Sequence, residues 1–315
     1  MRFTRIVPIG AVIVAVVIAV AVVLNGRSAG GQPGDPAAPK ATSLPHQPGA
    51  YLGVYTPPSP KSYAGLTAFT AATGVRPSVV VYYSGWREPF QLNFADAAVK
   101  HHAVPLVQID PTDVSLSAIA SGQYDAYLRS YAAAVKAFDS QVILSFGHEM
   151  NGNWYSWAYG HSSPAAFVAA WRHIVTVFRA AGASKVTWLW TVNILDKPLG
   201  IASPVRWWPG SSYVTWVGID GYYLKRSWTF ASLFGPTIKA VRSVTLAPIL
   251  ISETAATPAA DQPAKITDLF AGIRAYGLLG FVWFDVNRGR DWRLTAPAAI
   301  AAFRQGARGS ARPAS

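Results

Sequence analysis

Two glutamates stand out in a chain that has few acidic residues. Among its 315 residues only 15 are Asp or Glu, and Glu149 and Glu253 each follow an apolar run typical of a buried strand. A pair of carboxyl groups facing one pocket can break a glycosidic bond, because one carboxyl donates a proton to the leaving oxygen while the other, ionised, attacks the anomeric carbon. Glycosidic bond cleavage is therefore the first chemistry to consider.

The surroundings of the two glutamates differ in a way that suits this division of roles. Glu149 stands in HEMNGNWYSW, residues 148–157, whose aromatic side chains and low charge would desolvate the carboxyl and raise its pKa. Glu253 has hydroxyl residues on both sides, and with the hydroxyl of Tyr222 they are donors that stabilise an ionised carboxylate. We therefore expect Glu149 to be the acid and Glu253 the nucleophile.

These residues also have purely structural interpretations. A single Glu after a strand is often a cap or an ion-pair partner, but two glutamates at matching strand ends weaken that interpretation. Aromatic residues are usually core, yet NGNWYSWAYG, residues 151–160, is too polar and Gly-rich for a core helix, which favours a loop that stacks on sugar rings. His101 and His102 have no second ligand pair nearby, so we expect a solvated helix end and no metal site.

Eight apolar runs have the near-continuous hydrophobicity of strands covered on both faces. They span residues 51–56, 78–83, 104–110, 142–146, 185–191, 214–220, 248–252 and 279–284. Helical patterns occupy 62–73, 90–102, 124–139, 164–181, 230–244, 263–276 and 296–304. This α/β alternation predicts a (β/α)8 TIM barrel or a doubly wound open sheet. No nucleotide-binding glycine motif follows a strand, so the barrel is favoured, with both glutamates at its carboxyl-terminal face.

The amino-terminal residues predict export from the cytoplasm. Arg2 and Arg5 precede a 19-residue uncharged stretch, 6–24, long enough at about 1.5 Å per residue for one membrane crossing. It predicts a signal peptide cleaved near Gly30 or a single transmembrane anchor, with everything downstream outside. We expect residues 25–48 to form a Pro-, Gly- and Ala-rich linker. Residues 49–305 should form a single catalytic domain, and residues 306–315 a disordered tail.

Composition narrows the functional classes further. The chain has no Cys, which excludes a disulfide framework, a thiol nucleophile and zinc-cysteine or iron-sulfur sites, and we expect neither metal nor cofactor. The net charge of +12 is scattered without a basic stripe, which argues against nucleic acid as a partner. We expect a monomer that binds a polysaccharide and meets the membrane only through its N-terminal segment.

The motifs around both glutamates resemble glycoside hydrolase family 26. FGHEMNGNWYSW, residues 146–157, is similar to the acid/base signature of that family, and ILISET, residues 249–254, is similar to its nucleophile strand. GIDGYY at 218–223 and VWFDVNRGRDWR at 282–293 stand where the family has strands six and eight. The resemblance implies a (β/α)8 fold and retaining, endo-acting cleavage of β-linked polysaccharide, chiefly β-1,4-mannan, with mixed-linked β-1,3-1,4-glucan and β-1,3-xylan as other substrates.

The resemblance also implies roles for individual residues. Glu149 becomes the acid/base, Glu253 the nucleophile and Tyr222 a partner of Glu253. The other implied substrate contacts are His148, which also orients the acid, Asn151, Trp154, Trp157 and Trp283.

The substrate stays open because the chain departs from the mannanases of the family. Ser145 occupies the position where they tend to carry an arginine, and Asp291-Trp292-Arg293 is more typical of the mixed-linkage glucanases. The roles of Asp285, Asn287 and Asp291 stay unassigned.

The leading hypothesis is a secreted or membrane-tethered retaining endo-β-glycanase that acts outside the cell. The alternative is a catalytically inactive barrel that binds polysaccharide at the cell surface, which would keep the aromatic residues but need not keep both carboxylates. Both are present. Retention further predicts a separation of about 5 to 5.5 Å between the two carboxyl groups.

Overall fold

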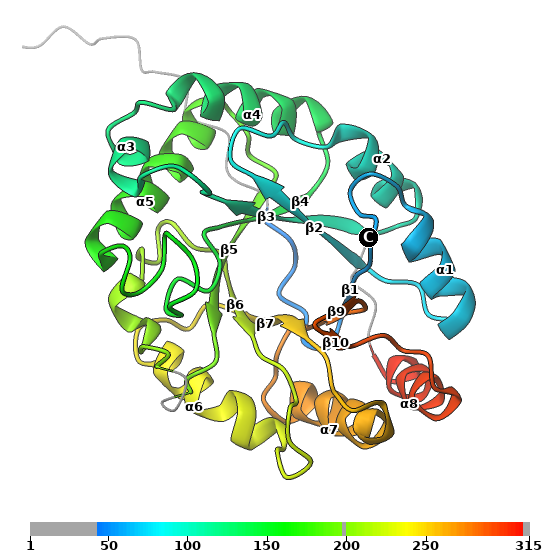
Figure 1. Ribbon diagram of the computed structural model, residues 1–315. Helices are drawn as coiled ribbons and strands as arrows, with labels where there is room; N and C mark the ends of the chain where they lie inside the picture. The colour runs from blue at the N-terminus through cyan, green and yellow to red at the C-terminus, as the bar shows by residue number, and fades with distance from the viewer. Residues whose placement is uncertain (1–42, 197–199, 311–315) are drawn as a thin grey trace, which may run out of the picture. The chain divides into compact units, whose positions relative to one another are not determined.

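The barrel predicted from the sequence is confirmed. A computed structural model describes residues 43–196 and 200–310, in which eight parallel strands close into a barrel in chain order, β8 pairing with β1 (Figure 1). The strands are β1 (Tyr51–Tyr55), β2 (Val79–Gly85), β3 (Val104–Asp110), β4 (Val142–Phe146), β5 (Val186–Asn193), β6 (Trp216–Asp220), β7 (Ile249–Thr254) and β8 (Gly280–Phe284). The open doubly wound sheet is thereby excluded.

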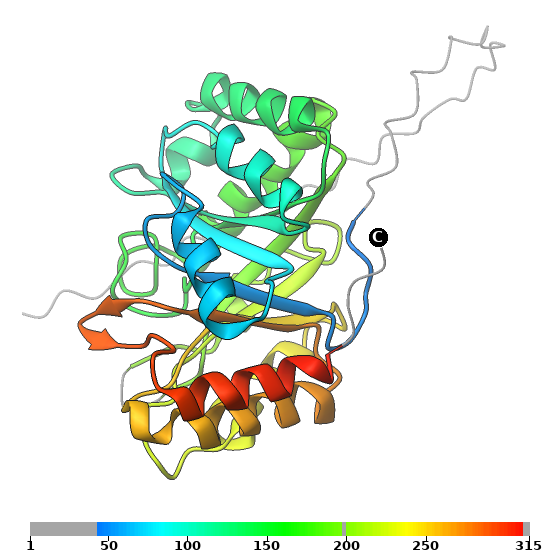
Figure 2. The same cartoon turned by 90° about the vertical axis from the view of Figure 1, so that its right-hand side faces the viewer.

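Helices surround the strands, and α7 and α8 run side by side in Figures 1 and 2. The helices are α1 (Ala64–Thr73), α2 (Leu92–Lys100), α3 (Leu116–Ala120), α4 (Asp125–Phe138), α5 (Pro164–Ala180), α6 (Phe230–Arg242), α7 (Gln262–Ala275) and α8 (Pro297–Arg308). Short elements that the sequence did not predict are α3, the 3-10 turns η2 (Pro204–Trp207) and η3 (Ala259–Asp261), and a hairpin of β9 (Asn287–Arg288) and β10 (Arg290–Asp291). All of them lie in connections, where no strong apolar period predicts an element.

Most element ends differ from the sequence prediction by a few residues, and two of these differences matter for the site and for the domain limit. β7 continues through Thr254, which places Glu253 inside the strand. Its register shifts against β6 between Leu250 and Glu253, and against β8 between Ile251 and Thr254. Such shifts re-aim side chains near active sites. α8 extends to Arg308 because Phe303 is fully buried and Gly306 lies against Phe270, so the folded domain continues beyond the expected limit at 305.

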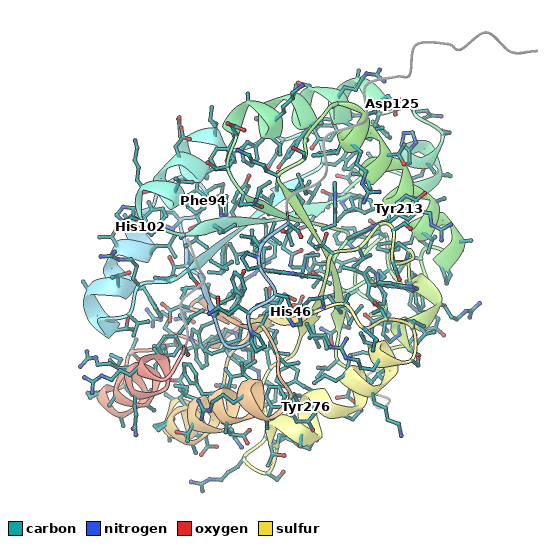
Figure 3. The ribbon with its side chains drawn as sticks, turned by 180° about the vertical axis from the view of Figure 1, so that it is seen from behind. His46, Phe94, His102, Asp125, Tyr213 and Tyr276 are labelled. Carbon is teal, nitrogen blue, oxygen red and sulfur yellow. The ribbon has the colours of Figure 1, made fainter. Side chains whose placement is uncertain are left out.

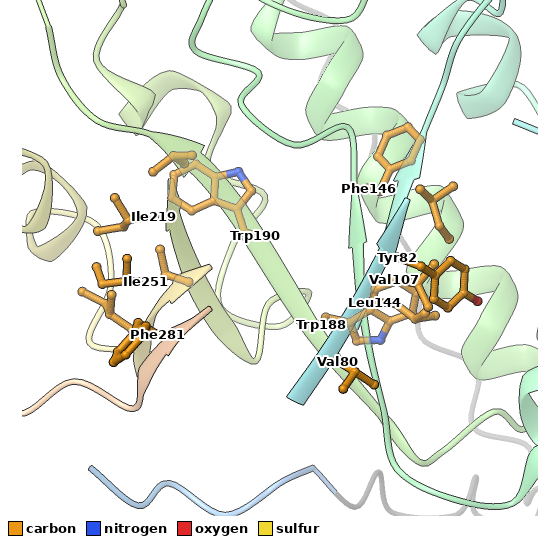
Figure 4. Close-up of a cluster of buried hydrophobic side chains, with 14 of the residues drawn as sticks. Val80, Tyr82, Val107, Leu144, Phe146, Trp188, Trp190, Ile219, Ile251 and Phe281 are labelled. Atoms are coloured by element: carbon orange, nitrogen blue, oxygen red, sulfur yellow. The ribbon is translucent and has the colours of Figure 1, made fainter. Parts of the chain in front are cut away.

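Side chains along each strand alternate between two apolar layers. One layer lies between strands and helices, and Figure 4 shows part of it, including Trp188 and Trp190 of β5. The other fills the amino-terminal part of the barrel interior, with Leu189 and Trp216 among its members. Nearer the carboxyl-terminal end the buried inner positions turn polar, as at Ser145, whose hydroxyl lies 2.9 Å from that of Thr191. The polar layer leads directly to the strand ends.

Residues 43–48 close the amino-terminal end of the barrel. Leu44 is buried in the inner apolar layer, and its backbone N–H donates to Thr187 Oγ1 at 3.1 Å. The Tyr51 hydroxyl donates to the Pro45 carbonyl at 2.7 Å, and His46 lies near the centre of the molecule when it is viewed from behind (Figure 3). The last part of the expected linker 25–48 therefore packs as part of the barrel.

The predicted export segment, 6–24, lies outside the described residues, as do the rest of the linker through residue 42 and the last five residues of the chain. Between residues 43 and 310, leaving aside 197–199, no helix is both long and apolar enough to cross a membrane.

Candidate active site

Glu149 lies in a turn immediately after β4 whose backbone is held from two sides. Gly147 and Glu149 have φ angles of 56° and 55°, in the left-handed region that favours glycine. The N–H of Gly147 donates to the Ile109 carbonyl at 2.9 Å, and that of Glu149 donates to the Thr191 carbonyl at 3.0 Å. A glutamate persists in this costly conformation only when its surroundings fix it, which is typical of functional sites.

The Glu149 carboxyl is buried and accepts a hydrogen bond on each oxygen. Asn193 Nδ2 donates to Oε1 at 2.5 Å, and Trp154 Nε1 donates to Oε2 at 2.8 Å. Burial raises the pKa of Glu149 to about 7, although the His148 charge and the two hydrogen bonds act in the opposite direction and the Glu253 charge adds to the increase. The carboxyl therefore exists in both protonation states near neutral pH, as an acid/base requires.

Glu253, on β7, accepts hydrogen bonds from two tyrosines. The Tyr83 hydroxyl donates to Oε2 and the Tyr222 hydroxyl donates to Oε1. Burial, and next the neighbouring Glu253 charge, raise the pKa of both tyrosines well above the ordinary value, so both hydroxyls keep their protons and remain donors. Tyr83 was missed in the sequence because it ends the apolar run VVVYY, where an aromatic residue is expected in the core.

His148 is a buried positive charge beside the acid/base candidate. Its Nδ1 lies 2.8 Å from Asp110 Oδ1, and its Nε2 lies 3.1 Å from the Tyr155 hydroxyl. Burial disfavours the charged imidazolium, but the Asp110 carboxylate outweighs it and the pKa of His148 is raised to about 10. Both ring N–H groups therefore donate at neutral pH, to Asp110 and to Tyr155, and His148 acts on Glu149 through its positive charge, which lowers the pKa of that carboxyl.

The hydroxyls beside Glu253 do not contact it as expected. Ser252 Oγ donates to Asp220 Oδ1 at 2.6 Å, and Thr254 Oγ1 is buried with no hydrogen-bond partner among the described residues. Burial, followed by the Glu253 and Glu149 charges, raises the pKa of Asp220 well above its usual range. The tyrosines alone supply the hydroxyl donors to Glu253 in the part of the chain described.

Trp154 and Trp157 lie in the same loop but differ in how far their side chains are exposed. The Trp154 side chain is 43% exposed and can offer one face to a ligand while its N–H binds Glu149. Trp157 is 2% exposed, its N–H donates to the His148 carbonyl at 2.9 Å, and Tyr155 stacks on its ring at 4.3 Å. The expectation that Trp157 faces the sugar is therefore wrong, because Tyr155 covers it.

Trp283 also lies in the core. It is 1% exposed, packs against Phe303 of α8 and donates to the Trp292 carbonyl at 3.2 Å. Because strand side chains alternate, Phe284 is the residue of β8 that turns inward, where it stacks on Tyr55 at 5.1 Å. The expected sugar contact of Trp283 is wrong, because its side chain is buried in the core, whereas Phe284 faces the barrel interior beside Tyr55 and Tyr222.

Asn151 was expected to bind substrate, but it is fully buried. Its side chain bonds the backbone of Asn193 and Ala202, so no sugar can reach it. As for metals, nowhere in residues 43–196 and 200–310 do three or more acidic or His side chains gather as ligands would.

Comparison with known proteins finds one matching family model and two related sequences. The family model described as Glycosyl hydrolase family 26 matches residues 106–293. Endoglucanase H of Acetivibrio thermocellus is 32% identical over 274 residues, which cover 82% of this chain and 30% of that protein. Beta-1,3-xylanase TXYA of Vibrio sp is 29% identical over 164 residues, 48% of this chain and 34% of that protein. The chain thus spans about a third of the length of these relatives.

Solved structures share the fold at low sequence identity. A modular endo-β-1,4-mannanase from Cellulomonas fimi has a TM-score of 0.64 at 15% identity, over 85% of this chain and 76% of that one. The GH26 β-mannanase of Bacteroides ovatus has a TM-score of 0.61 at 14% identity, over 84% and 90% of the two chains. The resemblance seen in the sequence motifs is confirmed by the family match, and the chain belongs to glycosyl hydrolase family 26.

Proposed function

We propose that this protein is a retaining, endo-acting hydrolase of β-linked polysaccharide. The observation that carries the proposal is the contrast between two neighbouring carboxyls. Both Glu253 oxygens accept hydroxyl donors, which suits an ionised nucleophile. Glu149 is buried, with a pKa raised to about 7, which suits an acid that later becomes a base.

The reaction follows from these two states. The Glu253 carboxylate attacks the anomeric carbon and forms a glycosyl ester, while Glu149 donates its proton to the leaving glycosidic oxygen. Glu149, now ionised, takes a proton from a water molecule, and that water displaces Glu253 from the sugar. The product keeps the configuration of the substrate because the anomeric carbon is inverted twice.

The Glu253 charge helps Glu149 to change roles. That charge contributes to the raised pKa of Glu149 in the free enzyme. Once Glu253 is esterified its charge is gone, and the pKa of Glu149 falls. The fall favours loss of the proton at the step that needs a base.

The substrate we favour is a β-glucan with β-1,3 and β-1,4 linkages, with β-1,4-mannan as the second choice. Ser145 in place of an arginine and the Asp291-Trp292-Arg293 segment support the glucan. So does the relative at 32% identity, which is named an endoglucanase, whereas the mannanases of similar fold share only 14% to 16% of the sequence.

Reducing-sugar release tests this proposal on lichenan, mannan, galactomannan, β-1,3-xylan and cellulose. We expect the highest rate on lichenan, a rapid early fall in viscosity that marks endo action, and β-configured product in the first minutes of an NMR time course. Glu253→Ala is the control for contaminating activity. Binding to lichenan without hydrolysis of any glycan would instead support the inactive binding barrel, and α-configured first product would refute retention.

We further propose that the protein is exported and acts on an extracellular glycan. The uncharged stretch 6–24 after Arg2 and Arg5 supports this. The chain also joins the barrel at the amino-terminal end, opposite the glutamates, where Leu44 packs inside. Fractionation of cells that express the full chain tests the proposal: activity in membranes means an anchor, activity in the medium means a cleaved signal, and soluble cytoplasmic enzyme with Met1 intact would refute both.

A further inference from the structure

We propose that Asn151 is a positioning residue, which holds the backbone of Asn193 so that the Asn193 carboxamide donates to Glu149. The proposal rests on the proposed function only in taking Glu149 as the acid/base. It replaces the expectation that Asn151 contacts the sugar, since the side chain is fully buried.

The Asn151 carboxamide brackets one residue. Its Oδ1 accepts from the Asn193 backbone N–H at 2.8 Å, and its Nδ2 donates to the Asn193 carbonyl at 2.9 Å. One side chain thus satisfies both polar backbone groups of a single residue, as a neighbouring strand would. Asn193 is the last residue of β5, so this bracket fixes the strand where the active site begins.

A strand cannot provide these bonds on that side of β5. β4 pairs with β5 only as far as Leu144 and Trp188, because the chain then turns sharply through Gly147 toward Glu149. On the other side β5 stays paired to its end, with Asn193 opposite Asp220 of β6. The Asn193 N–H and carbonyl would be left buried and unpaired, at a considerable cost in stability, without the Asn151 side chain.

Asn151 is itself anchored at a third point. Its Nδ2 also donates to the Ala202 carbonyl at 3.0 Å, and the Ala202 N–H donates to the Asn151 backbone carbonyl at 2.9 Å. The bracket therefore ties together the loop after β4, the end of β5 and the segment that follows β5. With three acceptor or donor partners and no exposure, the carboxamide has one orientation only.

The Asn151 side chain affects Glu149 through a single intervening residue, Asn193. Asn193 Nδ2 lies 2.5 Å from Glu149 Oε1, and the other Glu149 oxygen is bound by Trp154, a half-exposed loop residue. Asn193 is the donor that comes from a strand, so its position depends on the end of β5. The hydrogen bonds from Asn193 and Trp154 both stabilise the ionised form of Glu149.

Parallel pH profiles of Asn151→Ala and Asn193→Ala test the proposal. Glu149 must be protonated for the first step, so its titration sets the alkaline limb of kcat/KM. Loss of a donor to the ionised form moves that limb to higher pH, by about one unit, in both variants. We expect kcat to fall roughly 10- to 100-fold, because the ionised acid/base is left misplaced, with KM little changed. The double variant should shift the limb no further than Asn193→Ala alone.

Thr187→Val is the matched control. Thr187 is fully buried at the opposite end of β5 from Asn193. Its hydroxyl accepts a hydrogen bond from the Leu44 backbone N–H. This variant should lower the melting temperature and leave the pH profile unchanged. Should Asn151→Ala fail to fold, Asn151→Ser removes the same bracket with a smaller void and is judged by the same limb.

An alkaline limb that moves in Asn193→Ala but stays in place in the Asn151 variants would overturn the proposal and make Asn151 merely structural. An additive shift in the double variant would also overturn it. Failure of the proposed function is recognised separately, because the wild-type protein would then hydrolyse no glycan, or Glu149→Ala would hydrolyse the natural glycan at the wild-type rate.

Discussion

Replacing Trp154 with Phe separates the two contacts that this side chain can make. The indole N–H donates to Glu149 Oε2 at 2.8 Å, while 43% of the side chain remains exposed for stacking on a sugar. Phe keeps an aromatic face and removes the donor. A hydrogen bond to a charged group contributes about 1.5 kcal/mol or more, which corresponds to a rise of about one unit in the pKa of Glu149.

The expected result is a change in pH dependence without a large change in binding. The alkaline limb of kcat/KM for Trp154→Phe should lie about one unit above that of the wild type, since more alkali is needed to ionise Glu149. Trp154→Ala should add a loss of about 1 to 2 kcal/mol in polysaccharide binding. Because the side chain is half-exposed, both variants should keep a melting temperature close to the wild type.

Trp157→Phe is the control, since it removes a buried indole N–H that bonds the His148 carbonyl. It should lower the melting temperature more than Trp154→Phe does. The interpretation is refuted if Trp154→Phe leaves the alkaline limb in place, or if Trp154→Ala lowers the melting temperature by roughly 10 °C, which would make Trp154 a core residue.

Three further predictions concern other contacts of the site and core. Tyr83→Phe removes one hydroxyl donor to Glu253, and initial-rate kinetics should show kcat lowered about tenfold with the melting temperature little changed; an unchanged kcat would contradict the contact. The His148–Asp110 pair should stabilise the fold fully below pH 6.5 and lose that contribution as pH rises toward about 10, so urea titrations should show the wild-type advantage over His148→Gln shrinking in that window. Trp283→Ala should cost about 3 to 5 kcal/mol of unfolding free energy; a stable variant with weakened glycan binding would restore Trp283 to the cleft.

The strands were predictable because burial on both faces leaves a strong sequence signal. Each of the eight runs became a strand with ends shifted by a few residues. The two glutamates followed from the same signal, since a polar residue directly after a buried run lies at the barrel mouth. The short hairpin and α3 carry no such signal.

The side chains that line the site were harder to predict. In FVWF of β8 all residues are apolar, so the sequence does not tell which alternate side chains turn inward. The structure has Phe284 facing the interior, and the expected residue, Trp283, faces the helices. Tyr83 was hidden in the same way. Asn151 looks like an exposed loop residue because its partner Asn193 is 42 residues away in the sequence.

Trapping the covalent intermediate tests the central claim most directly. The enzyme is incubated with an activated 2-deoxy-2-fluoro glycoside, whose fluorine slows hydrolysis of the glycosyl ester, and its peptides are analysed by mass spectrometry. We predict one added glycosyl group, located on Glu253 within residues 249–254. A label on Glu149, or an unlabelled enzyme that still hydrolyses lichenan, would contradict the assignment of Glu253 as the nucleophile.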